Sequence, residues 1–192
     1  MKSTVFGFLI SLAIYSPLSN AVTLEIDAGE LTGAKGVIIG GISYDVSFIS
    51  QSCLGLFSGC TNFLFGSQSS ALAASTALEQ QVFNDSSPVH LNYDTNPQFT
   101  TNITSSVEGY FLTPYVRVGP NGRDVVSSAF VNGVGIVDSF DTSQIAIGSR
   151  PFGWGTYAYW TVSPVPLPAA AWLFGSGILA LAGFTNLRKS RA

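Results

Sequence analysis

Residues 113–140, "TPYVRVGPNGRDVVSSAFVNGVGIVDSF", decide the fold class, because short apolar segments are twice followed by Asn-Gly. Asn and Gly both tolerate positive φ, so an Asn-Gly pair between alternating segments is a strong signal for a tight hairpin turn. The pairs at 121–122 and 132–133 therefore predict a meander of three strands, Tyr115–Val118, Val125–Val131 and Val134–Asp138.

Alternation of apolar and polar residues continues on both sides of this meander. In "ISYDVSFI" and "TYAYWTV" every second residue is apolar or aromatic, which is typical of strands with one buried face. The run "GVIIGG" is apolar and flanked by glycines, and "QFTTNIT" again alternates. Further strands are thus predicted at residues 22–26, 36–41, 42–49, 98–104 and 156–162.

One segment has helical periodicity instead. In "SQSSALAASTALEQQVFND" (67–85) the apolar residues Ala71, Ala74, Leu78 and Val82 recur on one helical face. The serines before them can cap a helix start, which predicts one amphipathic helix from about Ser69 to Phe83. The predicted fold is therefore mainly β with one helix (α+β), an antiparallel sheet or sandwich spanning residues 22–163.

Cys53 and Cys60 are the two cysteines of the chain, and they lie just before this helix. In an oxidising compartment, paired thiols tend to form a disulfide, and the glycines between them let the chain curl. The alternative is half of a metal site, but two cysteines with the single histidine His90 make a poor zinc site. We therefore expect the disulfide.

The first 21 residues, "MKSTVFGFLISLAIYSPLSNA", have the pattern of a secretory signal peptide. Lys2 precedes an apolar run that is short for a bilayer span, and Ser19 and Ala21 are small residues at a cleavage site before Val22. A buried N-terminal helix is the alternative. The pattern predicts export, which is also the oxidising environment that the cysteines need.

The other end of the chain combines a stiff hinge, an apolar run and a basic tail. Residues 164–168, "PVPLP", alternate proline and are extended. Residues 169–187 carry no charged side chain, and as a helix they would span about 28 Å, close to the hydrocarbon thickness of a bilayer. We therefore expect a transmembrane helix at residues 169–187.

Flanking residues orient this helix. Trp172 lies where aromatic anchors favour the membrane interface, and Gly175 and Gly177 are small residues common in membrane helices. By the positive-inside rule, the basic tail at 188–192 stays in the cytoplasm and the domain lies outside. A buried helix and a GPI signal are the alternatives, but a GPI signal usually lacks a terminal basic cluster. The basic residues of the tail are Arg188, Lys189 and Arg191.

The tail "VPLPAAAWLFGSGILALAG…RKSR" closely resembles the PEP-CTERM class of bacterial C-terminal sorting signals, in particular its VPLPA variant. The resemblance covers residues 165–192. It implies a Gram-negative source, recognition by an exosortase (an integral-membrane cysteine protease) and cleavage near the Pro-x-Pro motif. It assigns recognition and processing to Val165, Pro166, Leu167 and Pro168. The middle of the chain resembles small exported PEP-CTERM proteins of unknown function, a likeness that implies no activity.

The charge and the motifs of the exported domain disfavour several classes of function. Between Val22 and Ser163 there are eleven acidic and four basic residues, a formal charge of −7, which disfavours nucleic-acid binding. No motif indicates a catalytic residue, a cofactor or a metal site, and the residues around His90 have the composition of a loop. Two groups of oxygen-bearing residues could contribute ligands to a calcium ion: Asp138 with Asp141, and Asp94 with Asn92 and Asn96. The simpler interpretation is that these are exposed side chains in turns.

An aromatic run, "RPFGWGTYAYW" (150–160), leaves two interpretations open. Aromatic faces stack on sugar rings, whereas strand alternation would bury about half of these side chains in the core. The leading hypothesis is a non-enzymatic protein that is anchored in the inner membrane as a precursor. It would then reach the cell surface or extracellular matrix with the help of the secretion machinery. The alternatives are a carbohydrate-binding module for extracellular polysaccharide, or a small hydrolase of matrix polymers with His90 as its candidate base.

Overall fold

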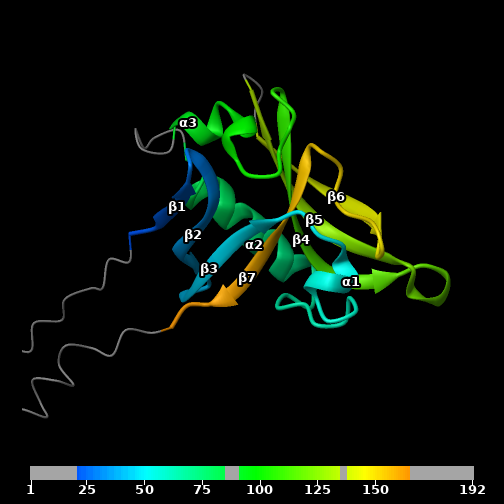
Figure 1. Cartoon of the computed structure of the whole chain (residues 1–192). Coiled ribbons are helices and arrows are strands. Elements are labelled where there is room, and N and C mark those ends of the chain that lie inside the picture. Colours follow the sequence, from blue (N-terminus) through cyan, green and yellow to red (C-terminus); the bar gives the residue numbers. More distant parts are fainter. Residues whose placement is uncertain (1–20, 85–90, 135–137, 165–192) are drawn as a thin grey trace, which may run out of the picture.

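The computed structural model describes residues 21–84, 91–134 and 138–164, which form one seven-stranded sheet with a long helix against it (Figure 1). In chain order the elements are β1 (Thr23–Asp27), β2 (Glu30–Ile39), β3 (Ile42–Ile49), α1 (Cys53–Leu56), α2 (Gln68–Gln81), α3 (Leu91–Asp94), the 3₁₀ helix η1 (Pro97–Phe99), β4 (Glu108–Val118), the 3₁₀ helix η2 (Pro120–Gly122), β5 (Asp124–Gly133), β6 (Ser139–Ala146) and β7 (Gly155–Val162).

The sheet consists of two three-stranded meanders joined by the last strand. The strand order is β1-β2-β3-β7-β4-β5-β6, and every neighbouring pair is antiparallel except β4 with β7. That parallel pair is short, with three residue pairs from Tyr110↔Gly155 to Leu112↔Tyr157. The prediction of a mainly β fold with one amphipathic helix is confirmed. The strands form a single mixed sheet backed by a helix and not a sandwich.

The two Asn-Gly pairs have different outcomes. Asn121 and Gly122 form the predicted turn between β4 and β5, both with positive φ (58° and 63°). The turn predicted at the second pair is wrong, because Asn132 and Gly133 continue β5 and pair with β4. The Asn132 side chain is buried and donates a hydrogen bond to the Tyr93 carbonyl (2.9 Å), which holds it in the strand. The third strand of the meander is β6, which pairs with β5, and residues 135–137 of the predicted strand lie outside the described residues.

The strand predicted at residues 98–104 is also wrong. Pro97 begins a 3₁₀ turn, and Asn102 has a left-handed φ of 67°, so the chain cannot stay extended. Thr100 makes only an isolated parallel bridge with Leu31. Phe99 is exposed and Ile103 buried, so the alternation over this stretch arises by coincidence in a compact loop.

Helix α2 covers one face of the sheet. It begins with a capping box, in which the Ser67 and Ser70 side chains bond each other's backbone N–H groups. The predicted apolar stripe is confirmed, since Ala71, Ala74, Leu78 and Val82 are all fully buried. They pack against an aromatic layer supplied by the strands, which includes Phe48, Phe111, Phe130 and Trp160.

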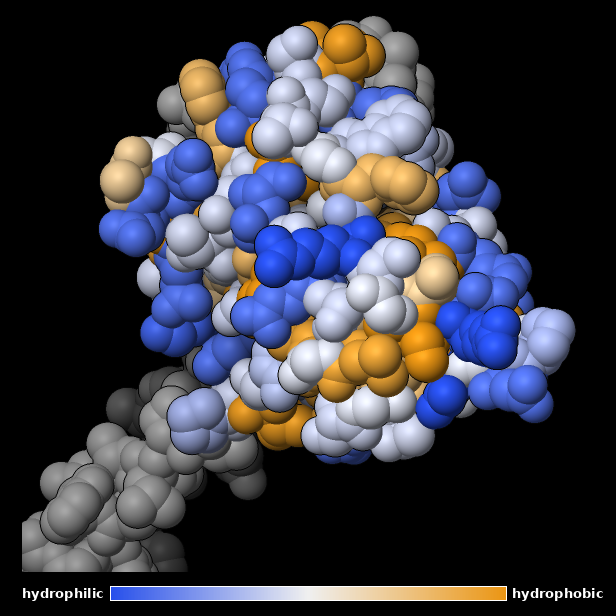
Figure 2. Space-filling view, turned by 45° about the vertical axis from the view of Figure 1, so that its right-hand side comes forward, coloured by the Kyte–Doolittle hydropathy of each residue, from blue (hydrophilic) through white to orange (hydrophobic). Residues whose placement is uncertain are grey.

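The opposite face is covered by the disulfide loop. Cys53 and Cys60 are joined, as predicted, with 5.4 Å between their Cα atoms, and both are fully buried. Together with Phe57 they pack on Leu112 and Tyr157 from the middle of the sheet. Figure 2 turns the side of α1 and β6 forward and shows apolar surface gathered into patches bordered by polar side chains.

Several predictions lie outside the described residues. These are the signal segment before Ala21, His90, the sorting motif Val165–Pro168, the membrane segment 169–187 and the basic tail 188–192. Within the described part of the chain, no helix is long and apolar enough to cross a membrane.

The two described ends of the chain leave the sheet on the same side (Figure 1). Thr23 at the start of β1 pairs with Lys35, and Val162 at the end of β7 pairs with Tyr44, which in turn pairs with Val37. The first and last strand residues therefore lie near the same end of the β1–β2–β3–β7 half of the sheet.

Candidate functional site

The aromatic run 150–160 divides between core and surface. Tyr157 and Trp160 are buried, on opposite faces of β7, in the two clusters that cover the sheet. Phe152 and Trp154 precede the strand and are 68% and 45% exposed. Within this run Trp160 is therefore a core residue and is no candidate for ligand contact.

Phe152 and Trp154 border a depression of about 190 Å³, which we name the aromatic hollow. It lies between the loop before β7 and the side chains of β4 and β6 on the sheet face that also carries the disulfide loop. The rings are arranged edge to face, with centroids 5.7 Å apart for Tyr110 and Trp154 and 6.3 Å apart for Phe152 and Trp154. Its lining residues are Tyr110, Leu112, Ser143, Ile145, Pro151, Phe152, Trp154 and Gly155.

Backbone hydrogen bonds hold the loop that carries these rings. Gly155 N–H donates to the Phe152 carbonyl (2.7 Å), and Tyr110 N–H donates to the Trp154 carbonyl (2.7 Å). The Thr104 hydroxyl and backbone N–H both donate to the Gly153 carbonyl, the hydroxyl at 2.6 Å. The backbone of the loop that carries the rings is therefore held before any ligand arrives, which lowers the entropy lost by the loop on binding.

Strand register places polar groups beside the rings. Directly opposed residues in antiparallel strands point to the same face, so Asp141 lies on the face of Ala129 and Leu112. By alternation Ser143 and Tyr110 share that face, as does Glu108, two residues before Tyr110. The lining of the hollow thus combines an apolar floor, exposed rings and two hydroxyl groups, and the Glu108 and Asp141 carboxylates lie on the same sheet face outside that lining.

The carboxylates affect the pKa of the Tyr110 hydroxyl. Partial burial raises its pKa above the usual value, and the negative charges of Glu108 and Asp141 raise the pKa further. A hydrogen bond to the Glu108 carboxylate also raises the pKa, because it stabilises the protonated hydroxyl. Asp141 also accepts a hydrogen bond from its neighbour, the Thr142 N–H (2.7 Å).

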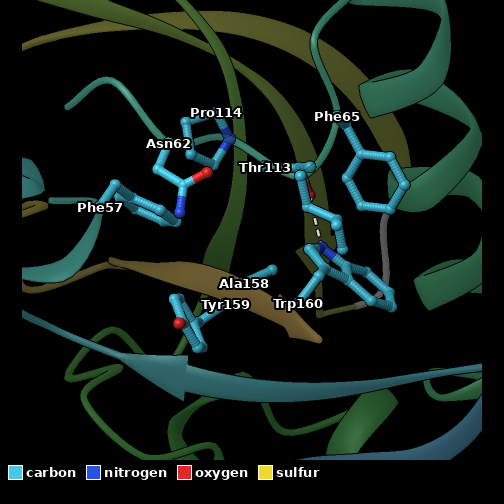
Figure 3. Close-up of a pocket in the computed structure, with 9 residues that line it drawn as sticks. Phe57, Asn62, Phe65, Thr113, Pro114, Ala158, Tyr159 and Trp160 are labelled. Carbon is cyan, nitrogen blue, oxygen red and sulfur yellow. Dashed lines mark hydrogen bonds between the residues drawn. The ribbon is translucent and has the colours of Figure 1, made fainter. Parts of the chain in front are cut away.

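A second pocket lies where β4 and β7 diverge beyond their short parallel pairing. Its volume is about 110 Å³. In Figure 3, Phe57 and Tyr159 lie to the left, and Phe65 and Trp160 to the right, where the Trp160 indole N–H donates to the Thr113 hydroxyl (3.2 Å). The chain runs through this gap from the disulfide loop to α2, so we interpret the pocket as packing around a connection. Its lining residues are Phe57, Asn62, Leu64, Phe65, Thr113, Pro114, Ala158, Tyr159 and Trp160.

The candidate calcium residues have local roles. Asp138 accepts a hydrogen bond from the Gly133 N–H (3.3 Å), and the Asn96 side-chain amide donates to the Thr95 hydroxyl (3.0 Å). Asp94 is buried, and its Oδ1 finds no hydrogen-bond partner among the described residues. Within the described ranges, no three His, Cys, Asp or Glu side chains are grouped so that they could hold a metal ion.

Comparison with known proteins adds no relative. No protein-family model, no curated protein and no solved structure matches the chain. The interpretation of the hollow therefore rests on its own geometry.

Sequence reasoning missed half of the hollow. Tyr110, Ser143 and Ile145 come from β4 and β6, and nothing in their local sequence separates them from other strand residues. They meet Trp154 only because β7 inserts beside β4, a pairing between residues more than 40 positions apart.

Proposed function

We propose that this chain is an exported, non-enzymatic protein of the cell surface or extracellular matrix. The support is the order of three features in the sequence: a secretory signal pattern, a proline motif resembling the VPLPA sorting signal, and an uncharged run followed by a basic tail. The precursor is held in the inner membrane and is released by an exosortase-type protease near residues 165–168.

The position of the chain ends supports this route. The first strand begins and the last strand ends on the same side of the domain. The proposed signal peptide and the proposed transmembrane segment can therefore both lie in one membrane without the chain passing around the domain. The last strand stops at Val162, and Pro166 follows four residues later. A folded domain with so short a spacer lies next to the membrane until the tail is cut.

The test uses the full chain in a Gram-negative host that makes an exosortase. Substituting Pro166→Ala and Pro168→Ala together should leave an unprocessed form in the inner membrane, seen by fractionation and by intact mass. Pro164→Ala, just outside the motif, is the matched control and should be processed. Normal processing of the double variant would refute the sorting proposal.

We further propose that the domain binds carbohydrate through the aromatic hollow. The observation that carries this proposal is the exposure of Phe152 and Trp154 on a loop held by hydrogen bonds. Exposed rings on a loop with a held backbone, near hydroxyl and carboxylate groups, suit a sugar, which has an apolar face and a hydroxyl-bearing edge. Exposed apolar side chains gathered in one patch with a polar border are a common mark of an interaction site.

Binding is measured with the purified full chain in detergent against polysaccharide fragments. Trp154→Ala should weaken binding about tenfold or more, the effect of removing an aromatic anchor. Phe99→Ala is the control, because Phe99 is 44% exposed but does not line the hollow. Equal binding by both variants would refute the assignment, and release of reducing ends would favour the hydrolase alternative.

A further inference from the structure

The border of the aromatic hollow has an uneven charge. Glu108 and Asp141 act on the hydroxyl of Tyr110, which is one of the hollow's own walls. Strand register puts both carboxylates on the face of the sheet that forms the floor. The nearest basic residue in sequence is Arg150, which is exposed and precedes the lining residue Pro151. Negative charge therefore faces the floor side, with one cation at the loop side.

The size of the hollow limits what it takes. Pockets for drug-sized ligands measure roughly 300–1,000 Å³, and this one measures about 190 Å³. It therefore holds one ring-sized group, while the rest of a polymer stays in solvent. Selection must then depend on the substituents of a single sugar unit.

We propose that the hollow prefers a pyranose ring carrying an amino group, accepts a neutral ring, and rejects a ring carrying a carboxylate. This inference rests on the proposed carbohydrate binding and names its ligand class. A carboxylate accepts hydrogen bonds and cannot donate them, so Asp141 and Glu108 pair with hydroxyl or ammonium donors on the ligand. A uronate would place like charges together, and the acidic domain surface adds to that repulsion.

An ammonium substituent on the sugar would make two favourable interactions in the hollow. It pairs with the carboxylates, and it lies close to the exposed face of Trp154, where a cation is attracted by the ring quadrupole. Tyr110 and Ser143 supply hydroxyls that both donate and accept, so they serve neutral rings as well. The expected order of affinity is amino sugar, then neutral sugar, then uronate.

The experiment titrates the full chain in detergent with three probes of equal length: oligomers of glucosamine, of glucose and of galacturonate. Asp141→Asn and Glu108→Gln should each weaken glucosamine binding by roughly 1.4- to 5-fold, the range for partly exposed charge pairs. The affinity of each variant for the glucose oligomer should change little. Each variant should bind the galacturonate oligomer more tightly than the wild type does. The amide oxygen of the D141N side chain can still accept from the Thr142 N–H, so this substitution preserves the local hydrogen bond within β6.

Two controls separate the possible failures. Glu30→Gln removes one exposed negative charge on the β1–β2 turn, away from the hollow, and should leave the order unchanged. If wild type binds none of the probes, or if Trp154→Ala binds as wild type does, the carbohydrate proposal fails. If Trp154→Ala abolishes binding but all three probes bind wild type equally, or if the galacturonate oligomer binds tightest, only the charge preference is overturned.

Discussion

Replacing Gly33 by alanine tests the close approach of β2 and β3. Gly33 is buried in β2 and pairs with Ser47 of β3. A Cβ atom added at Gly33 would lie 2.2 Å from the carbonyl oxygen of Val46. That oxygen belongs to the strand backbone and cannot rotate aside as a side chain could, so the two strands would have to separate or shift.

The magnitude follows from two opposed effects. Overpacking costs about 1–3 kcal/mol, and a contact with backbone belongs at the upper end. Alanine also restricts the unfolded chain, which offsets about 0.4–1 kcal/mol. A net loss of about 2 kcal/mol is expected, which lowers Tm by roughly 8 °C for a domain of this size. Thermal and urea unfolding of the full chain in detergent, followed by circular dichroism, measures it.

Gly66→Ala is the matched control. Gly66 is exposed, and a Cβ there meets no atom within 4 Å. The same substitution should be neutral or slightly stabilising at this position. If Gly33→Ala unfolds at the same temperature and urea concentration as Gly66→Ala, the strand contact is wrong and β2 does not pair with β3 in this register.

Two further predictions concern the sheet face beneath the disulfide loop. Substituting both Cys53 and Cys60 by alanine should lower the unfolding free energy by about 2.5 kcal/mol from lost loop constraint, measured by urea titration; an unchanged midpoint would contradict it. Burial raises the pKa of Tyr157 to about 12, so ionisation is disfavoured in the folded state. The contribution of this pKa difference to the free energy of unfolding is fully present below about pH 10 and is lost as the pH rises toward 12. Its hydroxyl has no hydrogen-bond partner in the described part of the chain. Tyr157→Phe should therefore be at least as stable at pH 7 and lose less stability than wild type above pH 10; parallel curves would refute this.

Local signals predicted those parts of the fold that depend on neighbouring residues. The face of α2 was predictable because Ala71, Ala74 and Leu78 recur at helical spacing, and the turn at Asn121 because Asn-Gly supplies positive φ. The disulfide was predictable because the chain has two cysteines a short distance apart.

The errors arose where tertiary contacts decide. Asn132 carries the same local turn signal as Asn121, but its buried hydrogen bond to Tyr93 keeps it in β5. The position of β7 between the meanders has no local signature, and it decides which rings meet at the hollow. For that reason Trp154 could be proposed from sequence, whereas its partner Tyr110 could not.

The central place of β7 determines when the protein can finish folding. Until residues 155–162 are available, β3 and β4 each present an open edge, the kind of surface that promotes aggregation. The strand that closes both edges is the last of the described sheet in sequence order and is followed at once by the proposed sorting tail. If the tail is the sorting signal that we propose, completion of the sheet and arrival of the tail at the membrane are nearly simultaneous, and a chain that stops before β7 would offer neither a closed sheet nor a substrate for release.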